Sequence, residues 1–339
     1  MSSLPLGVTL RSLDVTSEAD LDAAFAVAST CELESIGWTD ETPESIRSTI
    51  LGPHGLALGH RLAFDAGRPV GLLEVELDRH GREFFLDAYA VGPHRSAIES
   101  ALLQDGRQTA IDIASAEPAP AGTSLTDPYQ FSPDLWQVLA GGYVQDHAYT
   151  GILESLGFRP IRRFWRMLCD LTETPDVEPD PPAGVTRRVV AGEQDRRLLH
   201  ELFESSFSEH FGSSPDEPFA EWIARVESSP GNDPSRWWIA ELGGRPVGLC
   251  ILDDSKAEFG EGYVRTLGVL KEARGRGIGR WLLQCGAVDA VRRGRSAIAL
   301  AVDGENTTGA TTLYESVGYA IRQEIDVYCY PLLDTDASR

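Results

Sequence analysis

The sequence predicts an α/β (α+β) fold of two tandem domains, each a mixed, mostly antiparallel sheet flanked by helices. Three observations support this prediction. The hexapeptide Gly67–Leu72 recurs unchanged as Gly244–Leu249. A second similar pair, Leu153–Phe158 and Tyr314–Tyr319, follows in the same order in both halves. Segments with helical and strand periodicity alternate in the same order around these repeats, which indicates one structural unit used twice.

The expected elements follow the same order in each half. An amphipathic helix comes first, then two strands that form a hairpin at a glycine-containing turn, then a third strand. In the first half these elements are expected at 17–30, 61–77 and 84–91. In the second half they are expected at 193–211, 236–253 and 262–270, followed by helix 281–293, strand 296–303, helix 307–319 and strand 324–332. Gly318 is expected near the C-terminal end of the last helix.

The segment 172–184 separates the two repeats. It contains four prolines, four acidic residues and no basic residue, which is typical of a linker that is stiffened by proline and too polar to pack. We therefore expect domains at 1–171 and 185–339. The first half is longer because of a Pro- and Gly-rich stretch at 116–136. Its Tyr129, Phe131 and Trp136 are expected to belong either to a lid or to a packed surface loop.

Composition excludes several classes of protein. The 339 residues are 42% hydrophobic and 24% charged, as in an ordinary globular chain. The net charge of -22 argues against binding to nucleic acid or to anionic lipid, because both need a surplus of Lys and Arg. It favours a cationic small-molecule partner, although surface acidity can also serve solubility alone.

Five widely spaced cysteines, with no CxxC pair, indicate free thiols rather than disulfides or a zinc site. No metal ligand set is therefore assigned. The N-terminus lacks the pattern of a signal peptide, and no apolar run of about 20 residues exists. We expect a cytoplasmic protein that does not enter a membrane, either a monomer or a homodimer.

Three glycines lie between a predicted strand and a predicted helix, at 275, 277 and 279. Glycines let backbone N–H groups converge without side chains in the way, and the helix N-terminus adds its positive dipole end. Such a place binds phosphate, and Arg274, Arg276 and Arg280 add positive charge. The alternative is a turn that needs glycine only for tight packing.

The pattern Arg-x-x-Gly-x-Gly at 274–279, after a strand that ends Leu-Gly-Val, resembles the acyl-CoA loop of the GCN5-related N-acetyltransferase (GNAT) superfamily. About 30 residues further on, a second GNAT signature, N-x-x-A-x-x-L-Y-x-x-x-G-[FY], is matched by Asn306, Ala310, Leu313, Tyr314, Gly318 and Tyr319. The resemblance covers the second domain and extends, more weakly, over the first. It implies acetyl-CoA as the cofactor. The residues it implies for acetyl-CoA binding are Leu267, Gly268, Val269, Arg274, Gly275, Arg276, Gly277, Ile278, Gly279, Arg280 and Asn306.

The resemblance also implies direct acyl transfer to an amine. Tyr314 is expected to protonate the expelled thiolate, and the N–H of Val269 to polarise the thioester carbonyl. A base must take a proton from the attacking ammonium ion. Glu261 is the candidate, with Glu258 and Asp254 as alternatives; family members that carry a glutamate on this strand have it nearer the Leu-Gly-Val end, where this chain has Tyr263. Because alternate residues of a strand share a face, Glu261 and Leu267 are expected to point the same way.

Acidic and aromatic residues near the first helix of the second domain suit a cationic, partly apolar substrate. The substrate-binding residues predicted there are Glu204, Phe207, His210 and Phe211. In the first half, alignment places Ala97 opposite Gly277, Glu99 opposite Gly279 and Leu153 opposite Tyr314. A carboxylate at the diphosphate position repels the ligand, so the first domain is expected to be non-catalytic.

The expected function is N-acetylation of a primary amine on a small cationic molecule such as an amino-sugar antibiotic of the kasugamycin type. Mycothiol synthase, a tandem GNAT enzyme, represents one alternative, the acetylation of a thiol conjugate. A non-catalytic acyl-CoA-binding regulatory module and a protein Nα-acetyltransferase are further alternatives. No nucleic acid partner is expected.

Overall fold

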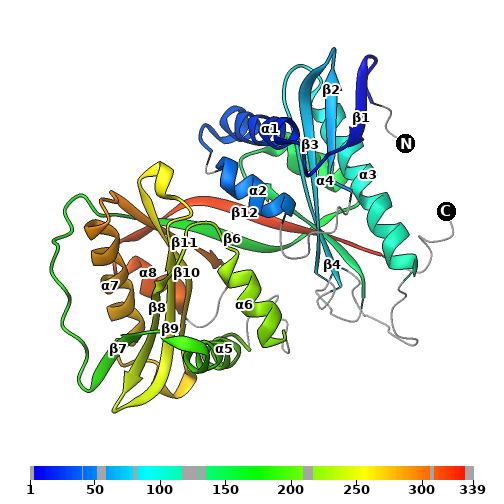
Figure 1. Ribbon diagram of the computed structural model, residues 1–339. Helices are drawn as coiled ribbons and strands as arrows, with labels where there is room; N and C mark the ends of the chain where they lie inside the picture. Colours follow the sequence, from blue (N-terminus) through cyan, green and yellow to red (C-terminus); the bar gives the residue numbers. More distant parts are fainter. Residues whose placement is uncertain are drawn as a thin grey trace. The chain divides into compact units, whose positions relative to one another are not determined.

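The computed structural model describes residues 4–39, 41–51, 59–78, 82–116, 129, 135–208, 217–305 and 309–332. The chain forms two compact units (Figure 1). Unit 1 comprises residues 1–163 together with 325–339, and unit 2 comprises residues 164–324. Each unit is a mixed sheet with helices packed on both faces, which confirms the predicted fold class.

Unit 1 has the strand order β1-β2-β3-β4-β5-β12, and within it only β4 and β5 are parallel neighbours among the described strands. Helices α1 and α2 cover one face through Leu72, and α3 covers the other through Leu73. Its elements are β1 (Val8–Ser12), α1 (Glu18–Ile36), α2 (Pro43–Leu51), β2 (Arg61–Asp65), β3 (Arg68–Asp78), β4 (Glu83–Ala90), α3 (Arg95–Ala116), β5 (Gln137–Tyr143) and α4 (His147–Ser155).

Unit 2 repeats this plan with the order β7-β8-β9-β10-β11-β6, where only β10 and β11 are parallel among the described strands. Helices α5 and α6 pack on one face, through Leu249 and Ile251, and α7 packs on the other, through Cys250 and Leu252. Its elements are β7 (Val185–Val189), α5 (Gly192–Phe207), α6 (Phe219–Glu227), β8 (Asn232–Leu242), β9 (Arg245–Asp253), η1 (Ala257–Phe259), β10 (Glu261–Val269), η2 (Lys271–Ala273), α7 (Ile278–Arg292), β11 (Ala297–Asp303) and α8 (Ala310–Glu315).

Two long strands belong to both units. In β6 (Arg159–Asp170), residues 164–170 lie in unit 2 and pair with β11. In β12 (Tyr319–Pro331), residues 325–331 lie in unit 1 and pair with β5. Each sheet is therefore completed by a strand from the other half of the sequence. The compact units differ for this reason from the expected division into 1–171 and 185–339.

The predicted hairpins are confirmed. Their two-residue turns, Ala66–Gly67 and Gly243–Gly244, have both central residues at positive φ, the conformation that matches the twist of paired strands. The helix predicted at 17–30 begins at the Ser17 cap, whose side chain accepts from the N–H of Asp20. It runs to Ile36, beyond the predicted end, and stops at Gly37 at φ 80.

The segment 172–184 is not a free linker. The indole Nε1 of Trp281 on α7 donates to the carbonyl of Pro179 at 3.0 Å. Arg292, on the same helix, pairs with Asp176 at 2.6 Å and with Glu178 at 2.9 Å. Two of the four acidic residues that made the segment look too polar to pack thus bind it to Arg292 of α7.

Two of the three aromatic residues of the first half's long stretch can be placed. Trp136 is 4% exposed and packs against Phe84 with ring centroids 5.2 Å apart, so it belongs to the core of unit 1 and not to a lid. The Tyr129 hydroxyl donates to the carbonyl of Gly157 at 3.1 Å. Phe131 lies outside the described residues.

All five cysteines are buried and free, as their spacing predicted. None of the helices in the described part of the chain is long and apolar enough to cross a membrane.

Candidate functional site

Strands β10 and β11 separate part of the way along their length. They pair in parallel only from Glu261 opposite Ala297 to Tyr263 opposite Ala299. Beyond that point β10 continues to Val269 with β9 on one side and no described strand on the other. The main-chain groups of this part of β10 on the β11 side are therefore not used by the described sheet. An extended ligand can add to such an edge as a further strand would.

A bulge in β10 sets the direction of its side chains. Val264 pairs with Leu252 and Thr266 pairs with Ile251, so Arg265 is an extra residue with no register partner on β9. One inserted residue reverses the alternation of side chains along a strand. Leu267 consequently lies on the face opposite Glu261, which corrects the expectation that the two share a face. Leu267 packs with the core on the α7 side.

The glycine loop after β10 leads into the N-terminus of α7. Gly275 and Gly277 have φ of 75 and 79, a left-handed conformation that side chains with a Cβ rarely adopt. Gly277 is the N-cap of α7 and provides no side-chain cap. The first N–H groups of a helix have no intrahelical partners, so they remain available for an anion. These N–H groups are the ones to which the sequence analysis assigned a diphosphate.

The three arginines of the loop have two different roles. Arg274 donates from Nε to the carbonyl of Val269 at 3.0 Å and from a terminal nitrogen to that of Ser206 at 3.3 Å. Arg280 donates to the carbonyl of Ser316 at 2.7 Å. These two arginines hold the loop against its neighbours, whereas the exposed Arg276 makes no such contact and can reach a ligand.

Two further residues that were predicted to bind acetyl-CoA, Gly279 and Ile278, have packing roles. A Cβ on Gly279 would lie 3.1 Å from Leu313 Cδ2, so this glycine lets α7 approach α8. Ile278 is 1% exposed and belongs to the core of unit 2. Asn306 lies outside the described residues.

Tyr314, the predicted proton donor, lies on α8 and is 9% exposed. Burial, followed by the neighbouring Cys250 thiol, raises the pKa of its phenol to about 12. Cys250 is the register partner of Leu267 on β10. The Tyr314 side chain therefore lies close to the strand segment that the open edge exposes. At neutral pH its hydroxyl keeps the proton that a leaving thiolate needs.

The structure does not bring Glu261 to this place. Its carboxylate pairs with the buried Arg166. It precedes Leu267 by six residues, which is about 20 Å of extended strand. Direct proton transfer needs a contact of about 3 Å or one bridging water, so Glu261 is not placed as a direct base.

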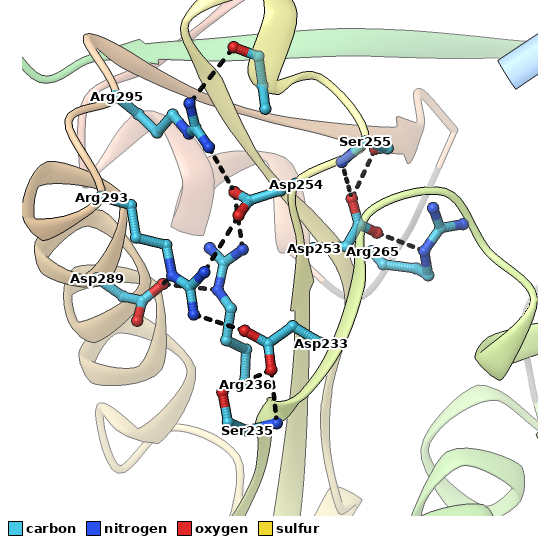
Figure 2. A network of polar contacts seen from close by, with 11 residues as sticks. Asp233, Ser235, Arg236, Asp253, Asp254, Ser255, Arg265, Asp289, Arg293 and Arg295 are labelled. Carbon is cyan, nitrogen blue, oxygen red and sulfur yellow. Dashed lines mark hydrogen bonds and ion pairs between the residues drawn. The ribbon is translucent and has the colours of Figure 1, made fainter. Parts of the chain in front are cut away.

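The alternative bases are also committed elsewhere or exposed. Asp254 pairs with Arg236 at 3.0 Å and with Arg293 at 3.2 Å, in a network that joins β8, the end of β9 and α7 (Figure 2). Asp289 pairs with Arg236 at 2.7 Å in the same network. Glu258 is exposed on η1. The acidic residues at the end of β9 therefore have a structural role in this network.

The helix that carries two of the predicted substrate residues, α5, packs on β10 at its C-terminal end. A Cβ on Gly268 would lie 2.8 Å from Ser206 Cβ. Phe207 follows Ser206 and packs on Phe203 with centroids 5.0 Å apart. The Glu204 carboxylate lies 3.7 Å from His200 Nε2 on the same helix. Two other predicted substrate residues, His210 and Phe211, lie outside the described residues.

In unit 1, side chains occupy the places that correspond to the glycine loop and the open strand edge of unit 2. Glu99 on α3 is fully buried and accepts from Arg95 Nε at 2.6 Å, while Arg95 also pairs with Asp146 at 2.5 Å. The Tyr149 hydroxyl accepts from the N–H of Ala88 on β4 at 3.4 Å. Strand β4 also pairs with β3 without a bulge.

Some of these features had no signal in a single sequence. The bulge at Arg265 and the contact of Ser206 with Gly268 depend on packing between distant segments. Tyr149 could have been found, because it precedes the repeated Leu153–Phe158 segment on the helix that corresponds to α8.

The comparisons with known proteins agree with this geometry. Residues 197–319 match the model of the acetyltransferase (GNAT) family. The mycothiol acetyltransferase of Thermobispora bispora is 33% identical over 190 residues, which cover 53% of this chain and 61% of that protein. The mycothiol acetyltransferase of Cellulomonas flavigena is 32% identical over 190 residues, which cover 52% of each chain. The chain thus spans less than two thirds of the length of these relatives.

Solved structures share the fold over nearly the whole chain. A GCN5-related N-acetyltransferase from Sphaerobacter thermophilus superposes with a TM-score of 0.78 and 24% identity, over 97% of both chains. A tandem GNAT protein from the clavulanic acid biosynthesis pathway has a TM-score of 0.71 and 14% identity, and the match covers 96% of this chain and 99% of that one.

Proposed function

We propose that this chain, whose residues 197–319 match the acetyltransferase (GNAT) family, transfers an acetyl group from acetyl-CoA to a primary amine of a small molecule. The observation that carries the proposal is the open edge of β10 beside the uncapped N-terminus of α7. One end of that arrangement suits a diphosphate and the other suits an extended, peptide-like arm.

Each step of the proposed reaction uses a group of this chain. The N–H groups at the start of α7 and the exposed Arg276 hold the diphosphate. The N–H groups of β10 around Leu267 to Val269 hold the pantetheine and polarise the thioester carbonyl. The amine attacks that carbonyl, the C–S bond breaks, and Tyr314 gives its phenolic proton to the departing sulfur.

No carboxylate of the described residues is assigned as the base that receives the proton of the amine. Water in contact with the open edge serves as the first acceptor of this proton and passes it to the solvent. Glu261 is proposed to position β10 against β6 through Arg166, because the ion pair joins these strands.

We propose that unit 1 does not catalyse acetyl transfer. The buried Glu99 lies at the α3 position that aligns with Gly279, and its side chain, paired with Arg95, occupies a place that glycine leaves open in α7. On β4, the strand that corresponds to β10, the N–H of Ala88 already donates to the Tyr149 hydroxyl.

Two substrate classes follow from different observations. The net charge of -22, together with the acidic and aromatic residues Glu204 and Phe207 on α5, favours a cationic amino-sugar of the antibiotic type. The mycothiol acetyltransferases, at 33% and 32% identity, favour the amine of a cysteinyl amino-sugar conjugate. Both classes present a primary amine on a polar scaffold.

The test is a turnover screen with acetyl-CoA, in which release of the free thiol of CoA is followed with a thiol reagent. Amino-sugar antibiotics, polyamines, amino acids, peptides and a cysteinyl amino-sugar whose own thiol is blocked are offered in parallel. Acetylation of one class in preference to the others supports the proposal and identifies the substrate. Binding of acetyl-CoA without turnover on any amine would refute the enzymatic role and favour a regulatory module.

A further inference from the structure

The sheet face of unit 1 that lies under α1 and α2 carries acidic side chains. Glu74 on β3 is the register partner of Asp87 on β4, and Glu76 lies two residues further along the same face. Leu72 and Tyr89 are the next register pair on this face, and both pack with α1 and α2. Three carboxyl groups therefore lie side by side at the border of an apolar core.

One of these carboxyl groups is buried without a partner. Glu74 is 4% exposed, and its Oε1 is buried with no hydrogen-bond partner. Buried carboxyl oxygens are almost always satisfied, so an orphaned one on this face marks a place where a donor is missing.

The charged groups that act most strongly on Glu74 are other carboxyl groups. Burial, followed by the charges of Glu41, Asp87, Glu76 and Glu32, raises the pKa of Glu74 well above the usual range. Glu32 accepts from the Tyr143 hydroxyl at 2.8 Å and from Thr39 Oγ1 at 2.6 Å. These carboxyl groups repel one another when they are ionised, so the fold favours their protonated form as long as no cation is bound.

The face can be reached by a ligand. Glu76 is exposed, and Asp87 and Tyr89 keep part of their surface in contact with solvent. Partial burial, followed by the charge of Asp87, raises the pKa of Glu76 to about 7. Among the described residues no group of three acidic, His or Cys side chains converges closely enough to hold a metal ion. The spacing suits several separate positive charges, and the ring of Tyr89 adds an aromatic surface for one of them.

We propose that unit 1 binds a polyvalent organic amine, with its ammonium groups at Glu74, Glu76 and Asp87 beside Tyr89. This site goes beyond the proposed acetyl transfer, because it lies on the half of the chain that has no intact acyl-CoA loop. The bound amine supplies the donor that Glu74 Oε1 lacks, and its positive charges favour the ionised form of the neighbouring carboxyl groups.

The test measures amine binding by titration calorimetry on the full chain without acetyl-CoA. Spermidine is the linear probe and kanamycin the amino-sugar probe, each at low ionic strength and again at 0.15 M salt. The double variant Glu74→Gln/Asp87→Asn is compared with Glu44→Gln, which removes one exposed carboxylate from α2. We expect at least tenfold weaker binding at one site in the double variant and unchanged binding in the control.

The outcomes separate this inference from its competitors. Equal affinity and stoichiometry in the wild type and the double variant would overturn the proposal, and so would an equal loss in Glu44→Gln, which indicates only general attraction to an acidic surface. Preference for one probe identifies the ligand class. The double variant removes repulsion and is expected to fold, which thermal unfolding with and without spermidine checks directly.

Failure of the proposed acetyl transfer would leave this test intact. The variant Gly277→Glu, which is expected to lose acetyl-CoA, should keep its spermidine binding through Glu74. An amine bound at unit 2 would persist in Glu74→Gln/Asp87→Asn and would appear as a second, unaffected site.

Discussion

Arg265, the extra residue of the bulge in β10, donates from Nε to Oδ2 of the buried Asp253 at 2.5 Å (Figure 2). The same carboxylate accepts from the N–H and the hydroxyl of Ser255, at 2.9 Å and 2.6 Å. The bulge is thus anchored to the end of β9. Because the bulge decides which face Leu267 occupies, this ion pair helps to place the open edge of β10.

The substitution Arg265→Met should destabilise the chain by about 2 kcal/mol, because it leaves a buried carboxylate without its cation. Urea unfolding measures the loss. The pair Asp253→Asn/Arg265→Met removes the uncompensated charge and should recover most of it, whereas Arg276→Met, at an exposed arginine, should leave stability unchanged. A single variant as stable as the wild type would show that the ion pair does not hold the bulge.

Replacement of Gly277 by Glu should abolish acetyl-CoA binding. The new carboxylate repels the diphosphate, and the φ of 79 strains any side chain by about 1–2 kcal/mol. The matched control is Gly294→Glu, because Gly294 has a φ of 75 and open space around a built Cβ. Calorimetric titration with acetyl-CoA should show normal affinity for the control only. Normal affinity in Gly277→Glu would refute the loop assignment.

The variant Tyr314→Phe should lower kcat by roughly tenfold to a hundredfold and leave the affinity for acetyl-CoA unchanged, because it removes only a proton donor. With a phenol pKa of about 12, the wild-type rate should not decline on the alkaline side through loss of this proton below about pH 11. Tyr319→Phe is the control, since the Tyr319 hydroxyl is buried without a hydrogen-bond partner. A kcat of wild-type size in Tyr314→Phe would remove the donor role.

Sequence patterns predicted well the turns and helix caps that depend only on neighbouring residues. The hairpin turns and the cap at Ser17 follow from the conformational freedom of glycine and from side-chain capping, which neighbouring residues determine. The glycine loop before α7 was readable for the same reason. Strands β1 and β7 had no clear alternation and were not predicted.

The features that were missed depend on contacts between distant segments. Glu261 and Leu267 lie on opposite faces, contrary to the prediction, because strand periodicity does not reveal the bulge at Arg265. Trp136 resembled a loop aromatic, yet it fills the core beside Phe84. The exchange of β6 and β12 between units leaves no trace in the repeat, since each strand keeps the same pattern whichever sheet it completes.

Unit 1 should lose stability as pH rises. Burial, followed by the charge of Asp78, raises the pKa of Glu83 to about 8 in the folded chain. In the unfolded chain the pKa of Glu83 is about 4.3, so the folded state binds the proton more tightly. The stability that this proton contributes is fully present below about pH 4 and is lost as pH rises toward 8. Glu83→Gln should reduce the difference in unfolding free energy between pH 5 and pH 8 by roughly 2–4 kcal/mol, with Glu44→Gln as the control. An unchanged pH dependence in Glu83→Gln would show that this carboxyl is ionised in the folded state.

The shared strands predict that a substitution in one half of the sequence destabilises the sheet of the other. Tyr328 on β12 is 4% exposed in the core of unit 1, and Met167 on β6 is fully buried in the core of unit 2. Truncation of a buried side chain of this size to alanine costs about 2–5 kcal/mol. Tyr328→Ala should therefore speed hydrogen exchange in β4 and β5, and Met167→Ala should do so in β10 and β11. The two variants control for each other. If each sheet were stabilised only by its own half of the sequence, the pattern of hydrogen exchange would be reversed. Tyr328→Ala would then speed exchange in β10 and β11, and Met167→Ala would speed it in β4 and β5.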